Sequence, residues 1–158
     1  MPNKHPAPVA EITIRAARPD DVPRIADVIA AADLPPLLIE EHLDGFVVGE
    51  QSGEIVACGG IEFYGDCAVI RSVVCDERIR GQGAGSRIAR ALLEHGRTAG
   101  ATDLYLFTGD ALPFWERHGF VEVTLDDWKE PPRACWQYQF VSQADELRAQ
   151  IHTMWRRA

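Results

Sequence analysis

Long apolar runs, positive charge and paired cysteines are all scarce in this 158-residue sequence. No apolar run approaches the roughly 20 residues that cross a bilayer, so no membrane partner is expected. A formal net charge of −8 argues against nucleic acid as the main partner. The cysteines lack CxxC spacing and the histidines lack a pairing pattern, so we predict buried thiols, a cytoplasmic protein and no metal site; the cysteines are Cys58, Cys67, Cys75 and Cys135.

The length is that of one domain, and the hydrophobic fraction of 46% is ordinary for a globular protein. Residues 1–10 are polar and proline-rich, which predicts a flexible leader. Residues 11–141 form the predicted domain. Residues 142–158 are predicted to form an amphipathic C-terminal helix, because Leu147 and Ile151 lie one helical turn apart. This helix and the apolar last strands suggest a homodimer.

Hydrophobic periodicity predicts an α/β fold with a mixed, mostly antiparallel central sheet flanked by helices. About seven strands are expected, at 11–17, 46–50, 54–64, 67–75, 104–108, 120–125 and 135–141. Helices are expected around 22–29 and at 37–43, 83–99 and 111–118. The strands at 67–75 and 104–108 flank a helix, which predicts a right-handed crossover with these two strands parallel. Gly59-Gly60 predicts a bulge or a close backbone approach.

The segment Ile70–Ser86 is organised as a strand, a glycine-rich turn and the start of a helix. Backbone N–H groups at such a turn and at a helix N-terminus favour phosphate. Gly83 and Gly85 lack a Cβ, so a phosphate can come close to the backbone. Arg80 adds a fixed positive charge. The sequence therefore predicts a pyrophosphate site at this turn.

Two motifs in this order resemble the GNAT superfamily, the Gcn5-related N-acetyltransferases. Arg80, Gly83 and Gly85 match its first signature. The segment Phe114–Phe120 matches its second signature at Phe114, Gly119 and Phe120. The resemblance implies a single GNAT domain and acetyl-coenzyme A as the acetyl donor. It also implies that the strands part after Arg71 and Leu104 to admit the thioester.

By the same resemblance, strand residues would pair with the pantetheine arm and the turn would hold the pyrophosphate. The cofactor-binding residues predicted in this way are Val73, Val74, Cys75, Arg80, Gly81, Gln82, Gly83, Ala84, Gly85, Ser86 and Phe114.

Acetyl transfer to an amine requires a base, because an ammonium has no lone pair. Glu62, between apolar neighbours on the strand beside the cofactor strand, is the predicted base; the alternative is an exposed strand residue. Arg71 is predicted to hold a substrate carboxylate, or else to pair with Asp66 or Glu62. Thr108 ends a buried strand, where ligands of open sheets tend to bind, and is predicted to contact the substrate.

One position departs from the family pattern. Family members commonly carry a Tyr that protonates the coenzyme A thiolate, where this sequence has Trp115, whose indole N–H does not titrate usefully. Either the thiolate leaves without a protein acid, or Tyr105 or Tyr138 serves. Cysteines 67 and 75 lack an obvious base, so direct transfer without an acyl-enzyme is expected. A non-catalytic acyl-coenzyme A sensor or subunit remains the alternative.

A narrower resemblance concerns the substrate. Glu62, Tyr64-Gly65, Arg71-Ser72, the strand 104–108 and Pro113-Phe114 resemble GNAT proteins associated with arsenic resistance. Related enzymes acetylate glutamate-like toxic amino acids, which implies a small-molecule amine substrate and a role in arsenic or antibiotic resistance. Acetylation of protein termini or lysines is the other alternative.

Overall fold

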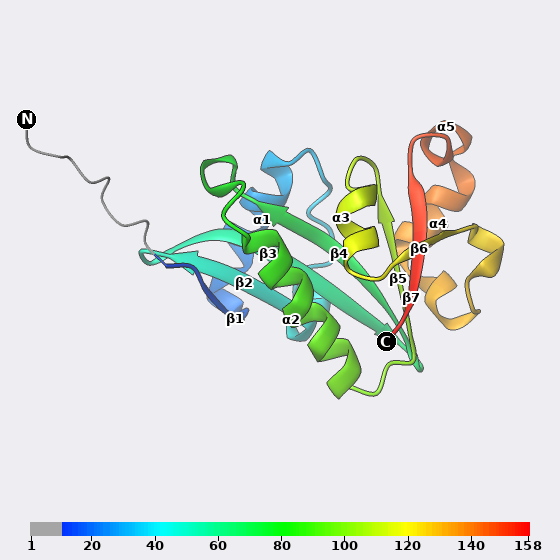
Figure 1. The fold of residues 1–158 in the computed structure, drawn as a ribbon, viewed down its shortest axis with the longest axis horizontal. Coiled ribbons are helices and arrows are strands. Elements are labelled where there is room, and N and C mark those ends of the chain that lie inside the picture. Colours follow the sequence, from blue (N-terminus) through cyan, green and yellow to red (C-terminus); the bar gives the residue numbers. More distant parts are fainter. Residues whose placement is uncertain (1–10) are drawn as a thin grey trace, which may run out of the picture.

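The computed structural model describes residues 11–158, so the predicted leader at 1–10 lies outside the described residues. A seven-stranded sheet runs through the molecule in the order β1-β2-β3-β4-β5-β7-β6 (Figure 1). β4 and β5 are parallel and every other neighbouring pair is antiparallel, which confirms the predicted sheet. The strands are β1 (Thr13–Ala16), β2 (Phe46–Gln51), β3 (Glu54–Tyr64), β4 (Cys67–Cys75), β5 (Asp103–Thr108), β6 (Val121–Val123) and β7 (His152–Arg157).

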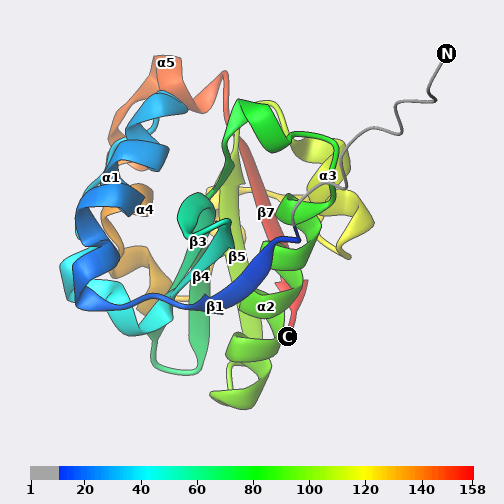
Figure 2. The ribbon, with the colours of Figure 1, turned by 90° about the vertical axis from the view of Figure 1, so that its left-hand side faces the viewer.

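Helices cover both faces of this sheet. Figure 2 shows α1, α4 and α5 on one side and α2 and α3 on the other. Their bounds are α1 (Val22–Ala31), α2 (Ala84–Thr98), α3 (Leu112–Arg117), α4 (Trp136–Gln143) and α5 (Asp145–Arg148). Ile25 and Ile29 of α1 and Ile88 and Leu92 of α2 are fully buried, which fixes these two helices on opposite faces of the sheet. Within residues 11–158 no helix combines the length and the apolar character needed to span a membrane.

The long β3–β4 pair contains one irregularity. Cys58 pairs with Val74 but Gly60 pairs with Arg71, so β4 has one residue more than β3 in this interval. Ser72 lies in this bulge with φ of 54°, a left-handed conformation that is uncommon for a residue with a side chain. The bulge predicted at Gly59-Gly60 is therefore confirmed, and it re-aims β4 where β5 begins to diverge.

The C-terminal region is helical, as expected, but over different bounds. The segment 135–141, predicted as a strand, contains α4, and the Sγ of Cys135 accepts a hydrogen bond from the N–H of Tyr138 at 3.3 Å at its start. Helical structure continues only through α5, so the prediction of one helix over 142–158 is wrong in its second half. His152–Arg157 instead forms β7, which lies between β5 and β6. β7 thus replaces the strand that was predicted at 135–141.

The apolar residues that suggested a homodimer are used inside the subunit. Met154 of β7 is fully buried, and the indole N–H of Trp155 donates to Asp103 at 2.8 Å. Leu147 and Ile151 line a cavity beside the sheet. The observation on which the homodimer prediction rested therefore no longer supports it.

Candidate active site

The site is organised by a fork between two parallel strands. β4 and β5 pair only from Cys67↔Asp103 to Val69↔Tyr105. Farther along, β4 stays paired with β3 as far as Cys75, while its β5 side has no strand partner among residues 11–158. The expected parting of the two strands is confirmed, and residues 73–75 present a backbone edge to which a ligand can add like a strand.

The glycine-rich turn follows this free edge. Gly81 and Gly83 have φ of 80° and 81°, and a Cβ at either position would meet nothing within 4 Å. The first backbone hydrogen bond of α2 runs from Arg87 N to Gly83 O at 3.2 Å. The N–H groups of residues 84–86 therefore precede the first helical partner, as at any helix N-terminus. Open space in front of unpaired amides fits an anion such as a pyrophosphate.

Two residues of the turn differ in how they can contribute. The sequence predicts that Gln82 helps to bind the pyrophosphate. Its backbone N–H, however, already donates to the carbonyl of Ile79 at 3.3 Å, so this amide is not available to a phosphate. The Arg80 side chain is 65% exposed, and its guanidinium lies 4.0 Å from the nearest carboxylate, Glu77. Arg80 is therefore free to turn toward an anion at the turn.

The second motif packs against the start of α2. The ring of Phe114 lies 3.6 Å from the position that a Cβ on Gly85 would take. Nε2 of His118 lies 3.3 Å from Oγ of Ser86. Burial and then the nearby arginines 90, 117 and 156 lower the pKa of His118, so its imidazole is neutral near pH 7. The two sequence motifs thus meet at one end of the fork.

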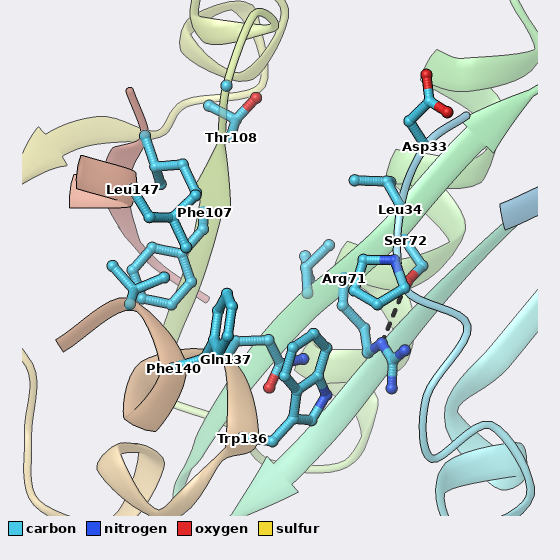
Figure 3. Close-up of a pocket in the computed structure, with 15 residues that line it drawn as sticks. Asp33, Leu34, Arg71, Ser72, Phe107, Thr108, Trp136, Gln137, Phe140 and Leu147 are labelled. Atoms are coloured by element: carbon cyan, nitrogen blue, oxygen red, sulfur yellow. Dashed lines mark hydrogen bonds between the residues drawn. The ribbon is translucent and has the colours of Figure 1, made fainter. Parts of the chain in front are cut away.

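Beyond the fork, a cavity of about 300 Å³ opens between β4, β5, α4 and the segment after α1 (Figure 3). Arg71 and Ser72 enter it from β4, and Gln137 reaches toward β4 from α4. Its lining consists of Asp33, Leu34, Pro35, Ile70, Arg71, Ser72, Phe107, Thr108, Gly109, Trp136, Gln137, Phe140, Val141, Leu147 and Ile151.

Arg71 is the one cation among these described lining residues, and it is 6% exposed. Its Nη1 donates to Glu62 at 3.2 Å and its Nε donates to Oγ of Ser72 at 3.1 Å. The guanidinium also lies over the rings of Phe46 and Trp136, at 5.5 and 5.6 Å. Its Nη2 is buried and has no hydrogen-bond partner within residues 11–158. A fixed guanidinium with one unused donor suits a carboxylate.

Glu62 lies behind this wall and does not line the cavity. It is 1% exposed, so the alternative of a solvent-facing strand residue is wrong. The carboxylate accepts hydrogen bonds from Tyr64 Oη at 2.5 Å, Gln137 Nε2 at 3.0 Å and Arg71. Nε2 of His42 lies 3.4 Å from its Oε1. This closed set of partners fixes Arg71 and Gln137, and it leaves Glu62 without direct contact to a substrate in the cavity.

The lining residues from α4 were missed from the sequence, and two of them carry buried polar atoms. Oε1 of Gln137 and Nε1 of Trp136 have no hydrogen-bond partner within residues 11–158. The sequence predicts a strand at 135–141, which gives these residues no place in a helix. A competing helical signal was present, because Gln137 and Val141 are four residues apart and are the buried residues of α4.

The two tyrosines considered as acids lie elsewhere. Oη of Tyr105 accepts a hydrogen bond from the backbone N–H of Lys129 at 3.2 Å. Oη of Tyr138 donates to the carbonyl of Leu125 at 3.4 Å. Neither tyrosine lines the cavity, so the structure gives no support to either as the acid.

Trp115 does not line the cavity either. It is 6% exposed and packs edge-on against Phe120 in the core. The hydroxyls at the fork belong to Ser72 and Thr108. Oγ1 of Thr108 accepts from the N–H of Ala111 at 3.2 Å, which leaves its own proton to donate. Thr108 therefore lies where the sequence placed a substrate contact.

The cysteines are poor nucleophiles. Burial raises the pKa of Cys67 to about 11 and the pKa of Cys58 and Cys135 to about 12. Burial also raises the pKa of Cys75, so its thiol stays protonated near pH 7. Across the part of the chain that the structure describes, no three His, Cys, Asp or Glu side chains gather in a way that could hold a metal ion.

Comparisons with known proteins agree with this geometry. A sequence model of the acetyltransferase (GNAT) family matches residues 13–120. N-acetylglutamate synthase from Neisseria gonorrhoeae, solved with coenzyme A and N-acetyl-glutamate, has a similar fold, with a TM-score of 0.78 and 21% identity. The match covers 94% of this chain but only 35% of the synthase chain, so this sequence spans about a third of that protein.

Two other similar structures match over nearly their whole length. Rv2747 from Mycobacterium tuberculosis, in complex with CoA and NLQ, has a TM-score of 0.76 and 23% identity over 92% of this chain and 99% of its own. The ribosomal-protein-S18-alanine N-acetyltransferase from Escherichia coli has a TM-score of 0.69 and 15% identity, and the match covers 93% of this chain and 94% of its own. At these identities the structures establish a shared fold.

Proposed function

The chain belongs to the acetyltransferase (GNAT) family and is an acyltransferase, and we propose that it moves an acetyl group from acetyl-coenzyme A directly to the primary amine of a small molecule that carries an acidic group. The observation that carries the substrate part of this proposal is Arg71, a buried guanidinium at the fork with an unused Nη2. A substrate carboxylate supplies the partner that this donor lacks.

The donor half of the site rests on backbone geometry. The free edge of β4 at 73–75 would hold the pantetheine arm, and the open turn at Gly81 and Gly83 with Arg80 would hold the pyrophosphate. When bound there, acetyl-coenzyme A supplies an activated acetyl thioester. The hydroxyls of Ser72 and Thr108 lie at the fork and can donate hydrogen bonds to polar atoms that arrive between the strands.

Glu62 has two proposed roles that pH separates. As a positioning residue it holds Arg71 and Gln137, whereas its role as the amine's base needs an intervening group because it lies behind them. If Glu62 is the base, Glu62→Gln lowers the rate near pH 7. The rate of the variant then recovers as pH rises, because the amine loses its proton to solvent without a protein base. If Glu62 only positions Arg71, Glu62→Gln raises the KM for the amine at every pH.

The resemblance to arsenic-resistance proteins supplies a narrower candidate, a glutamate-like toxic amino acid. The α-carboxylate of such a compound would pair with Arg71. The neighbour from Escherichia coli modifies a protein, so a protein or peptide acceptor belongs in the same test.

A thiol-release assay with acetyl-coenzyme A tests the proposal. The panel holds amino acids, phosphinic and arsinic glutamate analogues, polyamines and peptides, and each amino acid is paired with its carboxamide, which lacks the charge. We expect kcat/KM to be at least about tenfold higher for an acid than for its amide, the size of one charge-assisted hydrogen bond. Coenzyme A binding with no thiol release from any amine would favour the sensor instead.

A further inference from the structure

The cavity has two walls of opposite character. At one wall Arg71 and Gln137 supply two polar atoms, Nη2 and Oε1, that have no hydrogen-bond partner within residues 11–158. The facing wall is mainly apolar, with side chains from α4, α5 and β5 that include Phe107, Phe140 and Leu147, which Figure 3 shows gathered away from Arg71. The hydroxyl of Thr108 at the end of β5 is the polar group on this side. The molecule that fits this cavity is therefore polar at one end and apolar along its body.

The charges in the described lining residues allow one anionic group. Arg71 is the single cation, and Glu62 already neutralises it in part at 3.2 Å. The single acid of the lining, Asp33, is exposed and lies at the edge of the cavity opposite the apolar wall. A second anion on the substrate would meet no cation here and would lose its hydration against apolar side chains. A second carboxylate is therefore disfavoured.

The rim supports the same conclusion. Phe140 is 60% exposed and Leu34 is 42% exposed, and both belong to the cavity lining. When an apolar ligand covers large exposed apolar side chains, their surface is removed from water, which favours binding. An apolar body on the substrate would cover both.

We propose that the acceptor is an amine with one anionic group and an apolar body, of which an α-amino acid with an aromatic or branched aliphatic side chain is the simplest example. This inference rests on the proposed function, because it assigns the substrate of the same transfer. Arg71 binds the anionic group, and the wall that contains Phe140 and Leu147 binds the side chain. The selection is against a glutamate-like side chain that carries a second negative charge, so this inference replaces the glutamate-like candidate that the resemblance supplied.

The first experiment compares kcat/KM for the wild-type protein in the thiol-release assay. The pairs are leucine with glutamate, phenylalanine with its carboxamide, and phenylalanine with phenethylamine, which lacks the carboxylate. We expect kcat/KM to be at least about tenfold higher for the first compound of each pair. The loss of one apolar contact or ion pair worth about 1.4 kcal/mol lowers affinity tenfold. A preference for glutamate over leucine overturns this inference and leaves the proposed transferase function standing.

The second experiment uses variants of the apolar wall. Phe140→Ser should raise the KM for leucine and phenylalanine about tenfold, leave the KM for acetyl-coenzyme A unchanged, and reduce the preference over glutamate. Phe63→Ser is the matched control, because Phe63 is 39% exposed on β3, contacts His95 and does not line the cavity. An unchanged leucine-to-glutamate ratio in Phe140→Ser overturns the inference.

A binding measurement covers the case in which no turnover is seen. Calorimetry with phenylalanine in the presence of coenzyme A should show binding that Phe140→Ser weakens and Phe63→Ser does not. Binding without turnover would reject the transferase function while keeping the ligand class. Absence of both turnover and binding for the apolar amino acids would reject the ligand class itself.

Discussion

Arg71 donates from Nη1 to Oε2 of Glu62 at 3.2 Å inside the protein, with side-chain exposures of 3% and 0%, while its second terminal nitrogen has no hydrogen-bond partner within residues 11–158. The carboxylate thus holds the guanidinium in place and leaves one donor unused. A cation fixed before binding loses little conformational freedom when an anion arrives.

This pair should be strongly coupled in folding. Glu62→Gln leaves a buried guanidinium without its counter-charge and should lower the free energy of unfolding by about 3 kcal/mol or more. Adding Arg71→Gln to it should cost less than the sum of the two single changes. Urea unfolding of the four proteins measures this, and strict additivity would contradict it. Glu94→Gln, in the exposed Glu94–Arg97 pair, should change stability little.

Gly83 should matter twice, for the backbone and for coenzyme A. Its φ of 81° disfavours any side chain, so Gly83→Ala should cost about 1–2 kcal/mol of stability. Gly53→Ala is the matched control, because Gly53 has φ of 78° and equally open space, but lies in the turn between β2 and β3. Both should lose similar stability, and Gly83→Ala alone should raise the Kd for coenzyme A in calorimetry. Equal Kd values in the two variants would exclude the turn as the phosphate site.

Ser72 combines a strained backbone with a hydroxyl that contacts Arg71. Ser72→Gly removes the left-handed strain and Ser72→Ala retains it, so Gly should be the more stable of the two by about 1 kcal/mol. Both lose the acceptor for Nε of Arg71, and both should raise the KM for an acid-bearing amine. Thermal unfolding and steady-state kinetics measure the two effects separately. If Ser72→Gly alone keeps a wild-type KM, the hydroxyl has no role in binding.

Restoring the family's tyrosine should not restore an acid. Trp115 is buried against Phe120, so a hydroxyl placed there by Trp115→Tyr would lie in the core. The smaller ring should lower stability by about 1–3 kcal/mol, and kcat should not rise. A rate increase with a new alkaline limb in the pH profile would show that this position reaches the thiolate after all.

His118 should make the protein acid-sensitive. Burial, followed by the neighbouring arginines, lowers its pKa in the folded state below the ordinary value of 6.5. The unfolded chain therefore binds a proton more readily, and stability falls as pH drops below 6.5 toward the lower folded pKa. His118→Gln removes this contribution, so its Tm should decline less between pH 7 and pH 5.5 than that of the wild type. Parallel declines would contradict the burial effect.

Local sequence patterns were sufficient for most of the fold and for the glycine-rich turn. The glycine spacing from Gly81 to Gly85 and the apolar strand before it are local features, so the turn followed from them, whereas the parting of β4 and β5 was implied by the resemblance to the GNAT superfamily. Segments 135–141 and 152–157 were assigned wrongly because their conformation depends on partners distant in sequence. β7 becomes a strand by pairing with β5 and β6 on both sides.

The cavity that would hold the amine also depends on contacts between residues that are distant in sequence. Gln137 is buried because Glu62, 75 residues earlier, accepts its amide, and no local pattern reports such a partner. The phenol of Tyr105 is chemically suited to act as an acid, but the ring packs against Trp128 and its hydroxyl accepts the N–H of Lys129. Chemistry-bearing residues could be identified from the sequence, whereas the cavity that unites them required the fold.

The place of β7 sets an order on the assembly of the site during synthesis. β4, the glycine turn and α2 leave the ribosome well before β7, and β6 lacks its pairing strand until β7 follows. The apolar wall of the cavity includes Leu147 and Ile151, which immediately precede β7. In a nascent chain the segments proposed to hold coenzyme A therefore emerge before the wall proposed to select an amine.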